Sequence, residues 1–284
     1  MNLKAQLPYQ PRETPPRVGI IIVGDEILSG KRADKHLPRL IELLGARGLQ
    51  PEFADYVGDS PARITATLRR AFASGEIVFC CGGIGATPDD HTRQCAGLAL
   101  GRPLQLHPEA AALIRQRMQE LAQEKGIAYE PERDDNRHRL NMGVFPEGAT
   151  LIPNPYNRIA GFSCTGSEGG GVHFVPGFPV MAWPMMEWVL DSYYAHLFQP
   201  RSYVERSVIV YGAMEAALTP LMEEIEIQFP GVRIFSLPSV DHPEYGRHIE
   251  LGVKGEPEST QRAYTGMLAG LRQQQAKLGP ELVR

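Results

Sequence analysis

The run Val18–Val23 is apolar at every position and ends at Gly24. A second unbroken apolar run, residues 77–81, ends at the glycine pair Gly82-Gly83. Strands that are buried on both faces of a parallel sheet have such continuous apolar sequences, whereas strands with one solvated face alternate between apolar and polar residues. The two runs therefore predict two buried strands of a largely parallel sheet, and no other feature of the chain constrains its fold as strongly.

Helix and strand patterns alternate around these runs. Apolar residues recur at positions 37, 40, 41 and 44, on one face of a helix. We expect a strand over about 52–57, and a helix that begins after the N-cap Ser60 and ends at Gly75. Further helices are expected over about 92–100, 108–125, 130–143 and 179–198, with short strands between residues 148 and 178. This alternation predicts an α/β domain over residues 17–198.

The pattern restarts after a linker at about residues 199–202. From Tyr203 onward the expected order is strand, helix, strand, strand and helix, which is typical of a small α+β domain over 203–284. Residues 1–16 are polar and rich in proline, and they contain no apolar segment of the kind found in signal peptides. We therefore expect two domains that are preceded by an extended tail.

Composition narrows the class of protein. The 284 residues carry a net charge of −4, with a pI of about 6.1, so a nucleic-acid partner is not expected. No apolar run approaches the roughly 20 residues that a membrane span needs, so no membrane partner is expected either. The cysteines form no C-x-x-C pair, and we expect Cys80, Cys81, Cys95 and Cys164 to be small core residues in a reducing cytoplasm.

The segment CCGGIGATPDDHT, residues 80–92, joins the second apolar run to the next expected helix. Glycines at positions 82, 83 and 85 let backbone N–H groups approach an anion closely, and a helix that begins near Thr92 adds the positive end of its dipole. The segment matches neither G-x-x-x-x-G-K-[ST] nor G-x-G-x-x-G. It therefore predicts a phosphate site that differs from those of Walker-type ATPases and NAD enzymes.

Two adjacent carboxylates, Asp89 and Asp90, follow these glycines and would repel a phosphate unless a cation lay between them. Mg²⁺ prefers oxygen ligands and bridges carboxylates to phosphates, so we expect a metal site formed by Asp89, Asp90 and Asp25. Asp25, Glu26 and Asp59 follow the first two expected strands, whose carboxyl ends share one edge of a parallel sheet. The alternative is that Asp89 or Asp90 only caps the next helix.

Five segments occur in the same order as in the molybdopterin-binding (MoCF) domain, namely GDEILSG, VGD, CGGIGATPDDHT, EGATLIPN and FVPGFP. From about Arg17 to Leu197 the chain resembles this family, in particular the competence/damage-inducible protein A (CinA) branch. The later segment that contains SLPSV is similar to the small KH-like domain of that branch. The C-terminal amidase domain of longer relatives has no counterpart here, so deamidation of nicotinamide nucleotides is not expected.

The resemblance implies a three-layer α/β/α fold that is commonly oligomeric and binds a phosphorylated pterin or nucleotide. It also implies that Asp59 and Asp90 are the functional acids, as the matching residues are in MoCF domains that act on molybdopterin. The expected ligand contacts are Gly24, Asp25, Glu26, Gly82, Gly83, Gly85, Thr87, Thr92 and Gly177.

Three positions depart from the family pattern. Ala86 stands where the family usually has proline, and His36 stands where it usually has asparagine. The segment NRIAGF, residues 157–162, stands where the family usually has GTAPGF. The last two changes fall where a ligand is expected, so the chain's substrate need not be that of the family.

Three functions are open on this basis. The first is a homo-oligomeric protein that binds a phosphorylated pterin, such as molybdopterin, or a nucleotide, together with Mg²⁺. The second is a metal-dependent pyrophosphatase that acts on ADP-ribose or a related dinucleotide, an activity linked to the CinA branch. The third is a non-catalytic binding or scaffold protein that has kept the fold.

Overall fold

The computed structural model describes residues 17–166, 169–198 and 204–284. The expected tail over residues 1–16 lies outside these ranges, as does the expected linker. The chain divides into two compact units, Met1–Phe198 and Gln199–Arg284, and each is described by itself.

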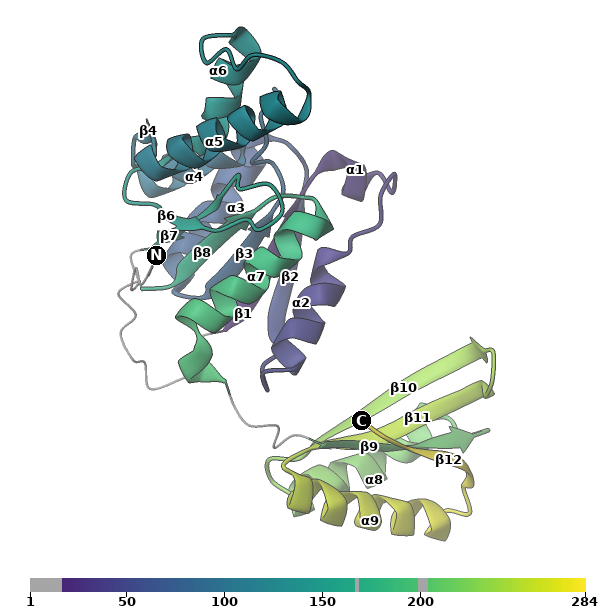
Figure 1. Ribbon diagram of the computed structural model, residues 1–284. Helices are drawn as coiled ribbons and strands as arrows, with labels where there is room; N and C mark the ends of the chain where they lie inside the picture. The colour runs from purple at the N-terminus through teal and green to yellow at the C-terminus, as the bar shows by residue number, and fades with distance from the viewer. Residues whose placement is uncertain (1–16, 167–168, 199–203) are drawn as a thin grey trace. The chain divides into compact units, whose positions relative to one another are not determined.

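The first unit is built on a six-stranded sheet in the order β2-β1-β3-β8-β7-β6 (Figure 1). The first three pairs in this order are parallel, and the last two pairs are antiparallel. The sequence prediction of an α/β domain with a mostly parallel sheet is therefore confirmed. The strands are β1 (Val18–Val23), β2 (Pro51–Val57), β3 (Ile77–Cys81), β6 (Thr150–Ile152), β7 (Gly161–Thr165) and β8 (Gly171–Val175).

Helices of the first unit pack on both faces of this sheet (Figure 1). A separate two-stranded sheet, β4 (Leu104–Leu106) with β5 (Val144–Pro146), was not predicted, and helices α5 and α6 lie between its two strands in the sequence. The helices are α1 (Asp25–Leu28), α2 (His36–Gly45), α3 (Pro61–Ser74), α4 (Thr92–Leu100), α5 (Pro108–Glu124), α6 (Asp134–Leu140) and α7 (Pro179–Tyr193), with 3₁₀ turns at Asn141–Gly143 and Ala195–Leu197.

The core explains why β1 and β3 are apolar at every position. Successive side chains of a strand point to opposite faces, and here both faces are covered. Ile21 and Cys80 pack with residues of α3 and α4, whereas Ile20 and Phe79 pack with residues of α2 and α7. All four cysteines are buried, as expected for small core residues.

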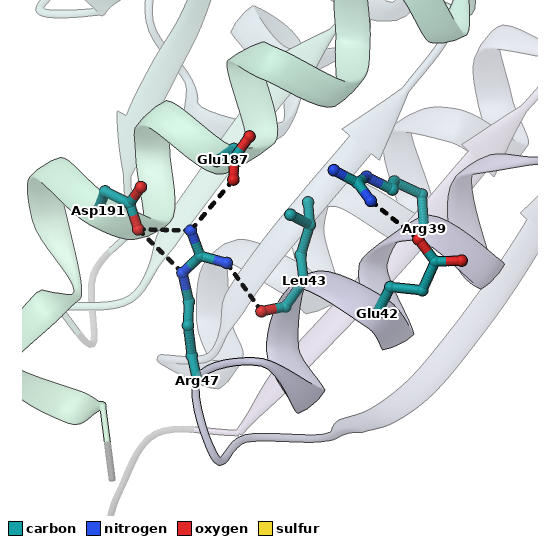
Figure 2. A network of polar contacts seen from close by, with 6 residues as sticks. All are labelled: Arg39, Glu42, Leu43, Arg47, Glu187 and Asp191. Carbon is teal, nitrogen blue, oxygen red and sulfur yellow. Dashed lines mark hydrogen bonds and ion pairs between the residues drawn. The ribbon is translucent and has the colours of Figure 1, made fainter. Parts of the chain in front are cut away.

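Helices α2 and α7 lie together on one face and are joined at both ends. Figure 2 shows Arg47, just after α2, donating two hydrogen bonds to Asp191 of α7, at 2.6 and 2.8 Å. The same guanidinium lies 3.6 Å from Glu187 and donates to the carbonyl of Leu43. At the other end of the pair, His36 Nε2 is 3.1 Å from the carbonyl oxygen of Gly177. The loop before α7 is therefore held in a fixed position relative to the start of α2.

Replacing Arg47 with methionine is expected to reduce the free energy of unfolding by about 1–2 kcal/mol. The side chain of Arg47 is only 12% exposed, but both acidic partners are about half exposed, so solvent screening limits the loss. Tryptophan fluorescence during urea unfolding measures the effect, because Trp183 and Trp188 both lie on α7. The control is Arg70→Met, which removes an exposed ion pair with Asp55 and should cost no more than about 0.5 kcal/mol. Equal losses in the two variants would contradict a special role for Arg47.

The second unit is an antiparallel four-stranded sheet in the order β10-β11-β9-β12, with two helices packed on one face. The predicted order of strand, helix, strand, strand and helix is correct, but it omits the last strand, β12, which pairs with β9. Its sequence contains Gly279 and Pro280, which are typical of turns rather than strands. The elements are β9 (Val204–Tyr211), α8 (Glu215–Gln228), β10 (Arg233–His242), β11 (Gly246–Gly255), α9 (Pro257–Gln273) and β12 (Lys277–Val283).

Among the described residues, no helix has the length and apolar character that crossing a membrane requires.

Candidate functional site

Loops at one edge of the large sheet enclose a cavity of about 440 Å³. The carboxyl ends of parallel strands meet at the same edge, so the loops that follow β1, β2, β3 and β8 come together there. The loop of residues 153–160 also reaches this edge, because it precedes β7, which is antiparallel to β8. Residues of all five loops line the cavity.

The loop after β3 passes close to other backbone, and only glycine fits at its start. Gly82 has a φ of 106°, and a Cβ atom there would lie 2.3 Å from the carbonyl oxygen of Val23. Gly83 has a φ of 68°, and a Cβ atom there would lie 2.2 Å from Thr92 Oγ1. The two glycines thus allow the loop to run between the end of β1 and the start of α4.

The same loop offers backbone donors to a ligand. Residues 83–86 line the cavity, and among the described residues none accepts a hydrogen bond from their amides. Helix α4 begins at Thr92 directly after the loop and contributes the positive end of its dipole. Free amides next to a helix N-terminus are a common arrangement for binding phosphate or another anion.

Asp90 closes the loop on itself. Its Oδ2 atom accepts hydrogen bonds from the backbone amide of Thr87, at 2.9 Å, and from the Thr87 hydroxyl. Arg93 supports the loop from within the protein, since its buried guanidinium donates to the carbonyl of Ile84. Burial lowers the pKa of Arg93, and the negative charge of Asp90 opposes that effect. These hydrogen bonds fix the orientation of the Asp90 carboxylate, and Asp90 lines the cavity.

Asp25 and Asp59 bind each other's backbone across the ends of β1 and β2. The amide of Asp25 donates to Asp59 Oδ2 at 2.9 Å, and the amide of Asp59 donates to Asp25 Oδ1 at 3.1 Å. Partial burial raises the pKa of Asp59, the hydrogen bond from the Asp25 amide opposes this, and the charges of Asp25, Glu26 and Asp89 raise it further. The acids of three loops are thus close enough to repel one another, which favours binding of a cation.

The donor set has the chemistry that Mg²⁺ requires, but the protein alone does not form a complete metal site. Among the described residues, no group of three or more His, Cys, Asp or Glu side chains is placed to hold a metal ion. Mg²⁺ commonly binds one or two carboxylates together with water and the phosphates of a ligand. Asp59, Asp89 and Asp90 line the cavity beside the phosphate-type loop, where one or two of their carboxylates would suffice for that mode of binding.

The cavity wall formed by residues 153–160 differs in chemistry from the wall that carries Asp59, Asp89 and Asp90. Asn154 is buried, and its Nδ2 atom donates to Asn157 Oδ1 at 2.8 Å and to the carbonyl of Ile159 at 3.0 Å. Asn157 Nδ2 lies 3.2 Å from the thioether sulfur of Met181. Carboxamides and apolar side chains thus form this wall, which contains no carboxylate among the residues that line the described cavity.

Most of the residues predicted from the sequence come together in this cavity. Thr92 does not line it, because its side chain is buried behind Gly83. Asp25 does not line it either, and its Oδ1 atom accepts a hydrogen bond from the amide of Asp59. The predicted residues that do line the cavity are Gly24, Glu26, Asp59, Gly82, Gly83, Gly85, Thr87, Asp89, Asp90 and Gly177.

Sequence reasoning missed several residues of the cavity wall. Arg32 brings a cation next to Glu26, at 4.0 Å, and Met142 and Met181 come from segments far from the glycine loop. Asn157 and Ile159 were noticed only as departures from a family pattern. Asn157 and Ile159 reach the cavity because β6 pairs with β7 in an antiparallel arrangement. Strands as short as these leave little pattern in the sequence from which that pairing could be predicted.

Comparison with known proteins agrees with this geometry. Residues 19–196 match the family described as "Probable molybdopterin binding domain". A protein of Aeropyrum pernix is 30% identical over 226 residues, which cover 80% of both chains. A CinA-like protein of Geotalea uraniireducens is 27% identical over 244 residues, which cover 86% of this chain and 54% of the relative. The chain therefore spans about half the length of that longer relative.

A solved structure agrees with this fold. The crystal structure of the protein CinA from Thermoplasma acidophilum aligns with a TM-score of 0.52 and 25% identity, over 62% of this chain and 96% of that one. The matched family covers more than half of the chain, and it includes every loop that lines the cavity. The chain belongs to the molybdopterin-binding (MoCF) domain family and is similar to its CinA-like members.

Proposed function

We propose that the first unit binds a phosphorylated pterin or nucleotide, with its phosphates at residues 82–90 and with Mg²⁺ between those phosphates and the acidic loops. The observation that carries this proposal is the juxtaposition of unpaired amides at residues 83–86 with three cavity-lining aspartates. The amides attract an anion, whereas the carboxylates repel one. A ligand that brings both phosphate and a divalent cation satisfies both groups.

Each aspartate has a distinct part in this proposal. Asp89 and Asp90 would hold Mg²⁺, which neutralises the phosphate charge when bound. Asp25 would keep Asp59 in place through the two carboxylate–amide hydrogen bonds. Family membership supports molybdopterin as one such ligand. We also propose that the chain forms homo-oligomers, as its resemblance to MoCF domains implies. We propose further that the second unit, an antiparallel sheet with two helices on one face, is KH-like.

A second candidate function is metal-dependent hydrolysis of a pyrophosphate bond in ADP-ribose or a related dinucleotide. The observation that favours it is the raised pKa of Asp59, which makes this carboxylate a better proton acceptor than an isolated aspartate. In that reaction, Asp59 would accept a proton from the attacking water. The amides of residues 83–86 would stabilise charge on the phosphate oxygens.

ADP-ribose is expected to raise the unfolding temperature of the protein only when Mg²⁺ is present. At 100 times the dissociation constant the ligand stabilises by about 2.7 kcal/mol, which corresponds to several degrees for a unit of this size. Asp90→Asn should abolish the shift, because the asparagine retains an acceptor for Thr87 but loses the charge. The matched control is Asp55→Asn, on β2 but outside the cavity lining, which should leave the shift unchanged.

The same samples separate the candidate functions. Release of AMP that disappears in Asp90→Asn supports the hydrolase, and binding without turnover supports the binding protein. Absence of any shift with ADP-ribose, ADP and a phosphorylated pterin, each with Mg²⁺, would contradict the proposal and favour a scaffold.

A further inference from the structure

The acidic loops after β1 and β2 and the loop of residues 153–160 lie at different ends of the cavity, and the loop after β3 lies between them. The strand order β2-β1-β3-β8-β7 separates the loops after β2 and β1 from the loop before β7 (Figure 1). Neighbouring strands are about 4.8 Å apart, so the two steps from β3, which precedes residues 82–90, to β7 correspond to roughly 10 Å. A nucleotide-sized molecule can therefore place its phosphates at residues 82–90 and its ring at residues 153–160.

The orientation of the Asn157 carboxamide at the second end is fixed by its partners. Its Oδ1 atom accepts from Asn154 Nδ2, at 2.8 Å, and from the backbone amide of Ile159, at 3.0 Å. The remaining terminal atom of the Asn157 carboxamide, Nδ2, is therefore the amino nitrogen. Within the described part of the chain, its one partner is the sulfur of Met181, at 3.2 Å.

The two N–H bonds of this amino group have no strong acceptor within the described part of the protein. A carboxamide nitrogen carries two N–H bonds, and a thioether sulfur is a weak acceptor. Asn154 differs, because its Nδ2 atom donates to two oxygen atoms and is satisfied. Of the two carboxamides on this wall, Asn157 is therefore the one that can donate to a ligand.

The neighbours of this donor suit a flat ring. Ile159, Met181 and Phe178 line the cavity beside Asn157, and the Phe178 side chain is 56% exposed. Aromatic and thioether groups pack well against heterocycles. A polar donor among apolar groups discriminates strongly for a matching acceptor, because a ligand without one would leave the donor unpaired.

We infer that Asn157 is a specificity-determining residue whose Nδ2 atom donates to a ring carbonyl oxygen or ring imine nitrogen of the ligand. The ligand class is then a phosphorylated heterocycle with a hydrogen-bond acceptor on the ring edge that faces residues 157–159. This inference rests on the proposed function, because it requires the phosphates to be held at residues 82–90.

The test compares two probes, pyrophosphate and ADP, each with Mg²⁺, by isothermal titration calorimetry. Asn157→Asp keeps the size of the side chain and the oxygen that accepts from Asn154 and Ile159, but it replaces the amino group with oxygen. ADP is expected to bind this variant at least tenfold more weakly than the wild type. The affinity for pyrophosphate should change less than threefold, because that probe has no ring.

Asn141→Asp controls for the added charge, because Asn141 is exposed and does not line the cavity. It should leave the affinities for both probes within threefold of the wild type. Unchanged affinity of Asn157→Asp for ADP, or equal weakening for both probes, would overturn the assignment. Equal affinity of the wild type for ADP and pyrophosphate would also overturn it. Failure of pyrophosphate to bind the wild type would instead contradict the proposed function itself.

Discussion

Replacing Gly82 with alanine is expected to lower the free energy of unfolding of the first unit by about 3 kcal/mol or more. The added Cβ atom would lie 2.3 Å from the carbonyl oxygen of Val23, which is backbone at the end of the interior strand β1. Neither group can rotate away, because the Gly82 amide also donates to the carbonyl of Val175 at 3.0 Å. The strand ends must then separate, and a clash of this kind in a packed core is among the most destabilising point changes.

Gly30→Ala is the matched control for this effect. Gly30 has a φ of 73°, also in the region that favours glycine, but a Cβ atom there has no described neighbour within 4 Å. Its replacement should cost only the backbone strain, about 1 kcal/mol. Urea unfolding followed by the fluorescence of α7 measures both variants. If the two variants lose the same stability, the contact with Val23 does not restrict position 82.

Substitution of Gly82 should weaken ligand binding as well as lower stability. Because the loop that contains Gly82 carries the unpaired amides of residues 83–86, a displaced strand end should misplace those donors. Gly82→Ala is therefore expected to lose the Mg²⁺-dependent shift with ADP-ribose even where the variant is still folded. Gly30→Ala should retain it.

The sequence predicted the first unit well where a single pattern determined the structure. Unbroken apolar runs predicted β1 and β3 because burial on both faces leaves no position for a polar residue. Proximity of strand ends followed from parallel pairing, which is why the acids of three loops could be placed together. The resemblance to the MoCF family then gave expected roles to particular residues such as Asp59 and Asp90, which composition alone cannot do.

Features that depend on pairs of distant residues could not be predicted in this way. Asp25 was expected to bind metal, and its hydrogen bond to the amide of Asp59 depends on the register of β1 against β2. The amino group of Asn157 meets Met181 only because α7 begins beside the loop of residues 153–160. Strand β12 was missed because its glycine and proline are unfavourable in strands, and both lie at the register shift between Leu278 and Glu281 in the pairing with β9.

One buried group of the first unit lies outside the cavity and affects stability at low pH. His173 of β8 is fully buried, with Nδ1 at 2.8 Å from Ser163 Oγ and Nε2 at 2.7 Å from the hydroxyl of Tyr194. Burial lowers the pKa of His173 to about 3. The folded protein therefore holds a neutral imidazole here at pH values where the unfolded chain, with a histidine pKa of about 6.5, becomes charged.

The sign of the pH dependence follows from this difference. Between about pH 6.5 and pH 3 the unfolded state binds one more proton at this position than the folded state, so stability falls as the pH falls. The slope is about 1.4 kcal/mol per pH unit, and by pH 5 the loss is about 2 kcal/mol. Above pH 6.5 both states are neutral, and this contribution is fully present.

His173→Gln separates this contribution from that of other titrating groups. At pH 7 the variant should be less stable than the wild type by about 1–3 kcal/mol, because the hydrogen bonds to Ser163 and Tyr194 are disturbed. The difference should then shrink by about 1.4 kcal/mol for each unit that the pH is lowered below 6.5, since glutamine cannot bind the proton. Denaturant unfolding at half-unit steps from pH 7.5 to 4.5 measures this difference directly. A difference that stays constant over that range would mean that His173 has nearly the same pKa in the folded and unfolded states.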